Sequence, residues 1–165
     1  MQLNNLYNGL TGLGSIFNKQ PEAIAFVRGS ADYPNINGRV LFYNTRQGVI
    51  VFTVVTGLPI SSYKCKGSVF AFHIHSGAAC TGNPQDPFAG VGAHYNPQNC
   101  PHPFHAGDMP PLLGNNGYAM SLFLTDRFTV DEIIGKTVII HKNPDDFATQ
   151  PSGNAGIKIA CGEIM

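Results

Sequence analysis

Short runs of apolar, aromatic and β-branched residues recur along this chain, separated by glycine, proline and asparagine. Apolar and polar positions alternate in several runs, as they do in a strand whose two faces meet different environments. Strands are therefore predicted at Ala23–Arg28, Arg39–Tyr43, Val49–Val55, Ser68–His75, Tyr118–Leu124, Thr137–His141 and Ile157–Gly162. Short links join the first three, as in a β-meander. No helical periodicity is strong, although Thr129–Glu132 has the residues of a capped helical turn.

The interval from Ser76 to Pro111 is rich in glycine, proline and asparagine and shows no strand pattern. Loops of this length are uncommon inside a domain and usually serve a function. We therefore expect an all-β barrel or sandwich that carries one elaborate loop. The 165 residues suit one domain, which we place at residues 21–165, with residues 1–20 as an N-terminal extension.

Charge and hydropathy exclude several classes of protein. Charged residues make up 12% of the chain, and basic and acidic residues balance, so no nucleic-acid partner is expected. The longest apolar stretches have the length of strands, so no membrane span is expected. The first residues lack the basic and apolar regions of a secretory signal. This predicts a cytoplasmic protein, or a secreted, periplasmic or cell-surface one if a signal has been removed.

Histidine is concentrated in one pattern. His73 and His75 alternate on a predicted strand, about 7 Å apart at a rise of roughly 3.3 Å per residue. Taken alone, such a pair of histidines more often has a structural role than a metal-binding one. The same holds for His141 at the end of its strand. The loop cluster, formed by His94, His102, His105 and Asp108, changes this balance because we find no other purpose for its histidines.

Imidazole suits copper and zinc, and a carboxylate added to imidazoles suits zinc. The six histidines and Asp108 give seven candidate ligands, one fewer than two four-coordinate sites require. One histidine must then serve both metals, which favours a dinuclear copper–zinc centre.

The four cysteines, Cys65, Cys80, Cys100 and Cys161, are far apart and form no CxxC pair. This argues against a zinc finger or a thioredoxin-type motif. Two disulfides are possible in three connectivities, and buried thiols are the alternative.

The sequence resembles the copper–zinc superoxide dismutase family, in its bacterial type, from about Ala23 onward. The matching segments occur in family order: Phe72-His73-Ile74-His75, Gly92-Ala93-His94-Tyr95-Asn96-Pro97, His105-Ala106-Gly107-Asp108, Gly135-Lys136-Thr137-Val138-Ile139-Ile140-His141, Gly153-Asn154-Ala155-Gly156 and Ile159-Ala160-Cys161-Gly162. The resemblance implies an eight-stranded Greek-key β-barrel or sandwich, immunoglobulin-like, with long metal-binding loops.

The resemblance also implies a set of site residues. Copper would be held by His73, His75, His94 and His141, and zinc by His94, His102, His105 and Asp108, with His94 as the bridge. Asp145 matches an aspartate that hydrogen-bonds one ligand of each metal, although a turn residue is the alternative. Cys80 and Cys161 match the family disulfide. Lys158 stands where the family usually has an arginine beside copper.

Some features depart from the family. The spacing between His102 and His105 is short, and Ser76–Ala79 and Lys142–Ser152 are short too, so the zinc and electrostatic loops are reduced. Cys65 and Cys100 have no counterpart. We consider three alternatives for these two cysteines. In order of preference, they form a second disulfide, they remain free thiols, or Cys100 intrudes on the zinc site.

The resemblance implies an enzyme that converts superoxide to O2 and H2O2 by Cu(II)/Cu(I) cycling, with Lys158, and to a lesser extent Lys142, attracting the anion. The alternative is a copper-binding or copper-delivery protein with little turnover on the same scaffold. A purely structural β-domain does not account for seven candidate ligands in this order. Superoxide is the expected small-molecule partner, and a homodimer is compatible with the family.

Overall fold

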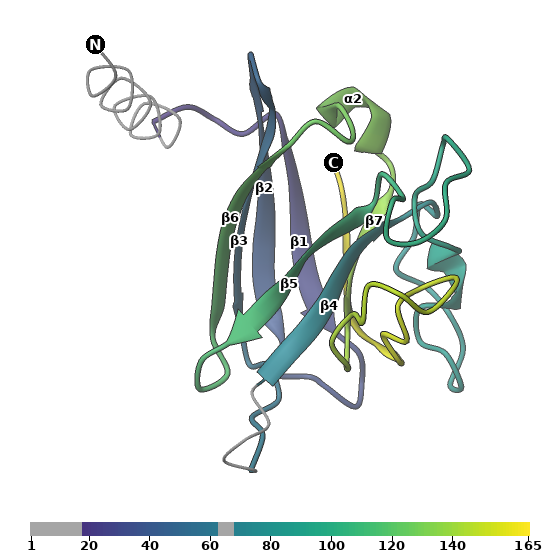
Figure 1. Cartoon of the computed structure of the whole chain (residues 1–165). Coiled ribbons are helices and arrows are strands. Elements are labelled where there is room, and N and C mark those ends of the chain that lie inside the picture. Colours follow the sequence, from purple (N-terminus) through teal and green to yellow (C-terminus); the bar gives the residue numbers. More distant parts are fainter. Residues whose placement is uncertain (1–17, 63–67) are drawn as a thin grey trace.

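Eight antiparallel strands form one sheet that curls into a nearly closed barrel with very little helix (Figure 1). The computed structural model describes residues 18–62 and 68–165. The strands are β1 (Ala23–Gly29), β2 (Asn37–Thr45), β3 (Gly48–Thr56), β4 (Ser68–His75), β5 (Asp108–Gly114), β6 (Ala119–Thr125), β7 (Thr137–His141) and β8 (Lys158–Glu163). Their order in the sheet is β5-β4-β7-β8-β1-β2-β3-β6. The β3–β6 and β4–β7 pairings give Greek-key connectivity, so the predicted fold class is confirmed.

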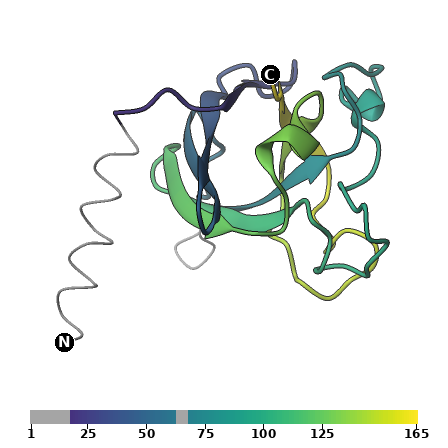
Figure 2. The ribbon, with the colours of Figure 1, turned by 90° about the horizontal axis from the view of Figure 1, so that it is seen from above.

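The interior of the barrel is filled by the apolar side of each alternating pattern. Phe42 on β2, Phe72 and Ile74 on β4, Leu112 on β5 and Ile140 on β7 are all fully buried. The ring of strands around this core is visible from above in Figure 2. Strand β7 is buried at every position, because the barrel core covers one face and the long loops cover the other.

The two long loops, residues 76–107 and 142–157, lie together on one side of the barrel (Figures 1 and 2). Short elements interrupt the connections: a 3-10 turn at Ala89–Val91 and the helical turn α2 at Val130–Ile133. Thr129 and Glu132 form the predicted capping box, in which the Thr129 N–H donates to Glu132 Oε2 at 2.7 Å. In the described part of the chain, no helix is long and apolar enough to span a membrane.

Strand β5 was not predicted from the sequence. It contains Pro110 and Pro111, which have no N–H to donate to a sheet and rarely occur in central strands. Here β5 lies at one end of the strand order, and the prolines fall where its pairing with β4 shifts register, between Phe70 and Phe72. The seven predicted strands are all present, with ends moved by a few residues. The assignment of residues 1–20 as an extension stays a prediction, since residues 1–17 lie outside the described part.

Candidate metal centre

Two groups of side chains in the described residues could each hold a metal ion, and they share His94. The first cluster is His73, His75, His94 and His141, and the second cluster is His94, His102, His105 and Asp108. In each cluster the ligand atoms lie within 4.8 Å of one another, and all seven residues are buried. The structure therefore brings together the residues that the resemblance implies for copper and for zinc.

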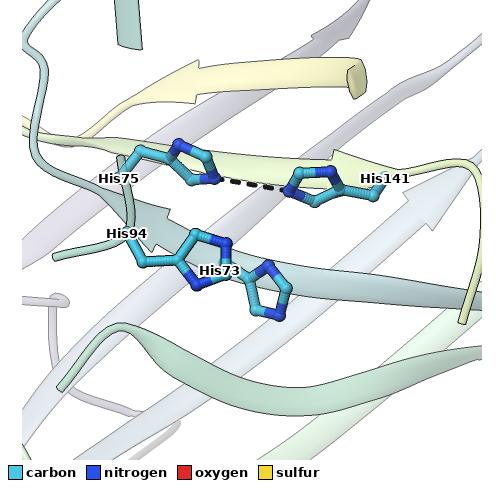
Figure 3. Close-up of side chains that lie close together, drawn as sticks. All are labelled: His73, His75, His94 and His141. Atoms are coloured by element: carbon cyan, nitrogen blue, oxygen red, sulfur yellow. Dashed lines mark hydrogen bonds between the residues drawn. The ribbon is translucent and has the colours of Figure 1, made fainter. Parts of the chain in front are cut away.

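The sheet positions the first cluster (Figure 3). His73 and His75 alternate with apolar residues on β4, and β4 pairs with β7 so that His73 lies opposite Ile139 and His75 opposite Thr137. His141 ends β7 two residues after Ile139, which places its ring beside those of β4. His94 comes from the loop through an isolated bridge to His75.

The loop that carries His94 is bonded to β4 through its backbone. The Tyr95 N–H donates to Ile74 O at 2.8 Å, and the Ile74 N–H donates to Gly107 O at 2.9 Å. A Cβ built at Gly107 would lie 2.3 Å from Ile74 O, so only glycine allows this close approach. This contact brings the two ends of the loop cluster, His94 and Asp108, to the same end of β4.

Two imidazole nitrogens of the first cluster face each other without a proton between them. His75 Nδ1 donates to Gly92 O at 2.8 Å, and His141 Nδ1 donates to Gly156 O at 3.1 Å. Burial lowers the pKa of His75 to about 3 and that of His141 to about 4, so both rings are neutral near pH 7. Their Nε2 lone pairs therefore point toward each other at 3.3 Å. A cation between them would relieve this repulsion.

Three further imidazole nitrogens are buried and make no hydrogen bond in the described structure: His73 Nδ1, His94 Nε2 and His102 Nδ1. His102 Nδ1 does face Asp108 Oδ2 at 3.0 Å, but both atoms are acceptors when His102 carries its proton on Nε2. An unpaired buried polar atom is costly unless something else satisfies it. His73 Nδ1 and His94 Nε2 belong to the first cluster, and His102 Nδ1 belongs to the second. These free acceptors fit a pair of metal ions.

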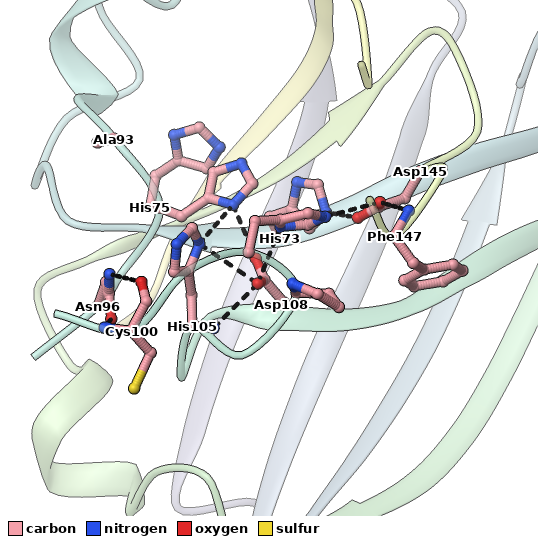
Figure 4. A network of polar contacts seen from close by, with 12 residues as sticks. His73, His75, Ala93, Asn96, Cys100, His105, Asp108, Asp145 and Phe147 are labelled. Carbon is pink, nitrogen blue, oxygen red and sulfur yellow. Dashed lines mark hydrogen bonds and ion pairs between the residues drawn. The ribbon is translucent and has the colours of Figure 1, made fainter. Parts of the chain in front are cut away.

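The second cluster is built around a carboxylate (Figure 4). Asp108 Oδ1 lies 2.7 Å from His94 Nδ1, and Asp108 Oδ2 lies 3.0 Å from His102 Nδ1 and 3.3 Å from His105 Nδ1. Burial opposes ionisation of Asp108, but its hydrogen bond with His94 and the charges of the nearby histidines hold its pKa below the ordinary value. Three imidazoles and an ionised carboxylate are a donor set that suits zinc.

Asp145 connects the two clusters. Its Oδ2 accepts from His73 Nε2 at 2.7 Å, and its Oδ1 accepts from His102 Nε2 at 2.9 Å. Because both Nε2 atoms carry the proton, Nδ1 of each ring is left as the free acceptor. A Cβ at Gly153, where φ is +67°, would lie 2.0 Å from Asp145 Oδ1, so glycine is required there. The position agrees with the role that the resemblance implies.

Residues 36–164 match the model of the family described as copper/zinc superoxide dismutase. The chain belongs to this family. A superoxide dismutase [Cu-Zn] of Legionella pneumophila is 35% identical over 135 residues, covering 77% of this chain and 76% of that protein. Superoxide dismutase [Cu-Zn] 2 of Aquifex aeolicus is 29% identical over 157 residues, covering 84% and 86%. The crystal structure of a SOD-like protein from Bacillus subtilis has a TM-score of 0.70 at 24% identity, covers 86% of this chain and 97% of that one, and shows the fold.

Copper and zinc are the metals of this family, and the two clusters fit them. The structure also contains the family disulfide, Cys80–Cys161, with Cα atoms 5.7 Å apart. Cys100 is a free thiol, so the second disulfide ranked first for Cys65 and Cys100 is wrong. The Cys100 backbone is hydrogen-bonded to the Asn96 side chain, and its sulfur points away from the histidines in Figure 4. Cys65 lies outside the described residues.

A pocket of about 750 Å³ opens over the first cluster. His75, His94 and His141 line it, and Lys158 stands on its wall. However, Lys158 Nζ lies 2.6 Å from Asp86 Oδ2, so the cation is paired with a carboxylate. Sequence reasoning missed Asp86, and Lys142 is not among the described residues that line the pocket.

Arg127 was also missed. It lies between β6 and α2, and its Nη1 donates to three backbone carbonyls of the metal loop: those of Pro103 at 3.0 Å, His105 at 3.4 Å and Asp108 at 3.1 Å. Two of these residues are ligand candidates of the second cluster. The guanidinium group therefore ties the backbone of this short loop to the end of β6. No local signal in the sequence marks this contact, which spans 19 to 24 residues.

Proposed function

We propose that this protein is a superoxide dismutase, with copper in the first cluster and zinc in the second. His94 is the observation that carries the proposal, since its Nε2 is free in the first cluster while its Nδ1 contacts Asp108 of the second. A single imidazole that faces two ion sites is the arrangement expected of a shared ligand. Copper would supply one-electron chemistry through Cu(II)/Cu(I) cycling, by which two superoxide ions and two protons become O2 and H2O2.

The residues of the chain have distinct tasks in this reaction. His75 and His141 present Nε2 toward the pocket, because their Nδ1 protons are held by the carbonyls of Gly92 and Gly156. His94 Nε2 is the atom that can take up a proton and pass it to the reduced product, while Nδ1 stays on the side of Asp108. The second cluster holds the His94 ring in place and tunes its basicity.

The same geometry suits a copper-binding or copper-delivery protein with little turnover. Two observations favour this second candidate. The Lys158–Asp86 ion pair reduces the positive charge available to an arriving anion. In addition, a relative that is 32% identical over 114 residues is described as a superoxide dismutase-like protein. Under this proposal the clusters bind metal as above, but with unbound copper removed by a chelator, superoxide decays little faster than it does spontaneously.

Metal analysis combined with superoxide decay distinguishes the two candidates. We expect about one copper and one zinc per chain after loading, and rapid superoxide decay. Metal that binds in this ratio without rapid decay would favour the delivery protein. Copper with no zinc, even after zinc loading, would mean that the shortened loop does not form the second site.

Three matched histidine variants test the assignment of ligands. His141→Ala should lose copper and keep zinc, His105→Ala should weaken zinc and keep copper, and His94→Ala should affect both metals and abolish their magnetic coupling. Elemental analysis and electron paramagnetic resonance measure these effects. Equal loss of both metals in His141→Ala would contradict the proposed assignment.

A further inference from the structure

Asp86 is held in one position by its own loop. Asn83 Oδ1 accepts the N–H groups of Gln85 and Asp86, both at 2.9 Å, and Asp86 Oδ1 accepts the Phe88 N–H at 3.1 Å. Phe88 is buried in a small core cluster with Val91, Ile139 and Cys161. The Cys80–Cys161 disulfide joins this loop to β8. The Asp86 carboxylate is therefore anchored, and only its Oδ2 is directed at Lys158.

Lys158 is held from the other side. It begins β8, and its backbone pairs with His141 of the first cluster. The Lys158 side chain is 18% exposed, against 41% for Asp86, so the ion pair lies at the rim of the pocket with the lysine inside.

The charges on the pocket wall do not favour an anion. Besides the histidines, the charged residues that line the pocket are Asp32, Asp86 and Lys158, which gives one cation and two carboxylates. An anion that approaches the first cluster therefore meets a neutralised lysine. A partly exposed ion pair contributes little to folding stability.

We propose that Asp86 limits the access of anions to the first cluster by holding Lys158 in an ion pair. This proposal rests on the proposed function and identifies Asp86 as the residue that sets how strongly the site attracts superoxide. Lys158 acts as the anion-contacting group when it is released, and Asp86 acts through Lys158.

Azide binding to the copper-loaded protein, followed by optical titration, tests this without turnover. Asp86→Asn keeps the side-chain oxygen that accepts the Phe88 N–H and replaces the charged Oδ2 by an amide NH2, which cannot accept from Lys158. We expect it to raise azide affinity about tenfold, the order expected when the cation of Lys158 is freed from its partner charge in a partly solvated pocket. Asp126→Asn is the matched control, because it makes the same change in net charge at an exposed residue outside the pocket wall. Its azide affinity should stay within about twofold of wild type.

The same substitution in a Lys158→Gln background tests whether Asp86 acts through the lysine. If the ion pair is the mechanism, Asp86→Asn should raise azide affinity much less when Lys158 is absent. An equal gain in both backgrounds would show that Asp86 acts as an isolated charge and would overturn the proposal, as would a gain no larger than that of Asp126→Asn.

Superoxide decay at matched copper content separates this proposal from the proposed function. With both correct, Asp86→Asn should be faster than wild type and more sensitive to ionic strength, because more attraction is available for salt to screen. If azide binding behaves as expected but neither the wild type nor any variant speeds superoxide decay above its spontaneous rate, the role of Asp86 stands and the dismutase function fails.

Discussion

Loss of the Cys80–Cys161 disulfide should lower the free energy of unfolding of the metal-free protein by about 4.5 kcal/mol. The disulfide closes a loop between residues 81 positions apart. For a loop of this length, the chain-entropy relation gives about 15 cal/mol/K of lost unfolded-state entropy, or about 4.5 kcal/mol at 25 °C. The loop includes most of the ligand candidates, so its release also frees the backbone that positions them.

Two perturbations separate the entropy of the cross-link from packing. Reduction of the wild-type protein keeps both sulfur atoms, whereas Cys80→Ala/Cys161→Ala also removes the buried Cys161 sulfur and should cost about 1 kcal/mol more. Cys100→Ala is the control, because Cys100 is a free thiol. Urea unfolding of the metal-free forms provides the free energies and m-values. A loss below about 1.5 kcal/mol on reduction would refute the reasoning, since the unfolded chain would then gain little freedom from the broken cross-link.

Two further predictions concern the metal loop and pH. Arg127→Ala should weaken zinc binding about 10- to 100-fold with little change in copper binding. Chelator competition and the Co(II) spectrum of the second cluster measure this effect. Arg46→Ala, at an exposed arginine, is the control and should leave the binding of both metals unchanged. Because the pKa values of His75 and His141 fall from 6.5 to about 3 and about 4 on folding, the unfolded chain binds more protons below pH 6.5. The free energy of unfolding of the metal-free protein should then have its full value above pH 6.5. It should fall as the pH is lowered toward 4, by up to about 1.4 kcal/mol per pH unit for each histidine. A urea midpoint that stays constant from pH 7.5 to pH 5 would contradict this.

Periodicity was sufficient to predict the strands whose alternating residues face the barrel core, such as Val49–Val55. It failed at β5, because Pro110 and Pro111 indicate a loop when only local sequence is considered. The structure tolerates them because β5 lies at the end of the strand order and changes register at that point. The edge position is a property of the whole sheet, and no window of sequence around the prolines contains it.

The ligand candidates could be selected from the sequence because metal binding uses few residue types, and these are concentrated in short motifs. Contacts that modify the site could not be selected in this way. Lys158 and Asp86 are 72 residues apart. The local sequence around Asp86 indicates only an ordinary residue of a proline-rich turn. Arg127 likewise gives no signal, because its role depends on which backbone carbonyls the folded loop presents to it.

Asp145 has a consequence for how metal ions bind to this protein. One carboxylate orients His73 of the first cluster and His102 of the second, so an ion that fixes either ring also restricts the other. Binding at the two sites is therefore coupled in free energy, and by linkage each ion changes the affinity of the other by the same factor, whichever arrives first. At limiting metal, an excess of fully loaded over half-loaded molecules would show that this coupling is positive.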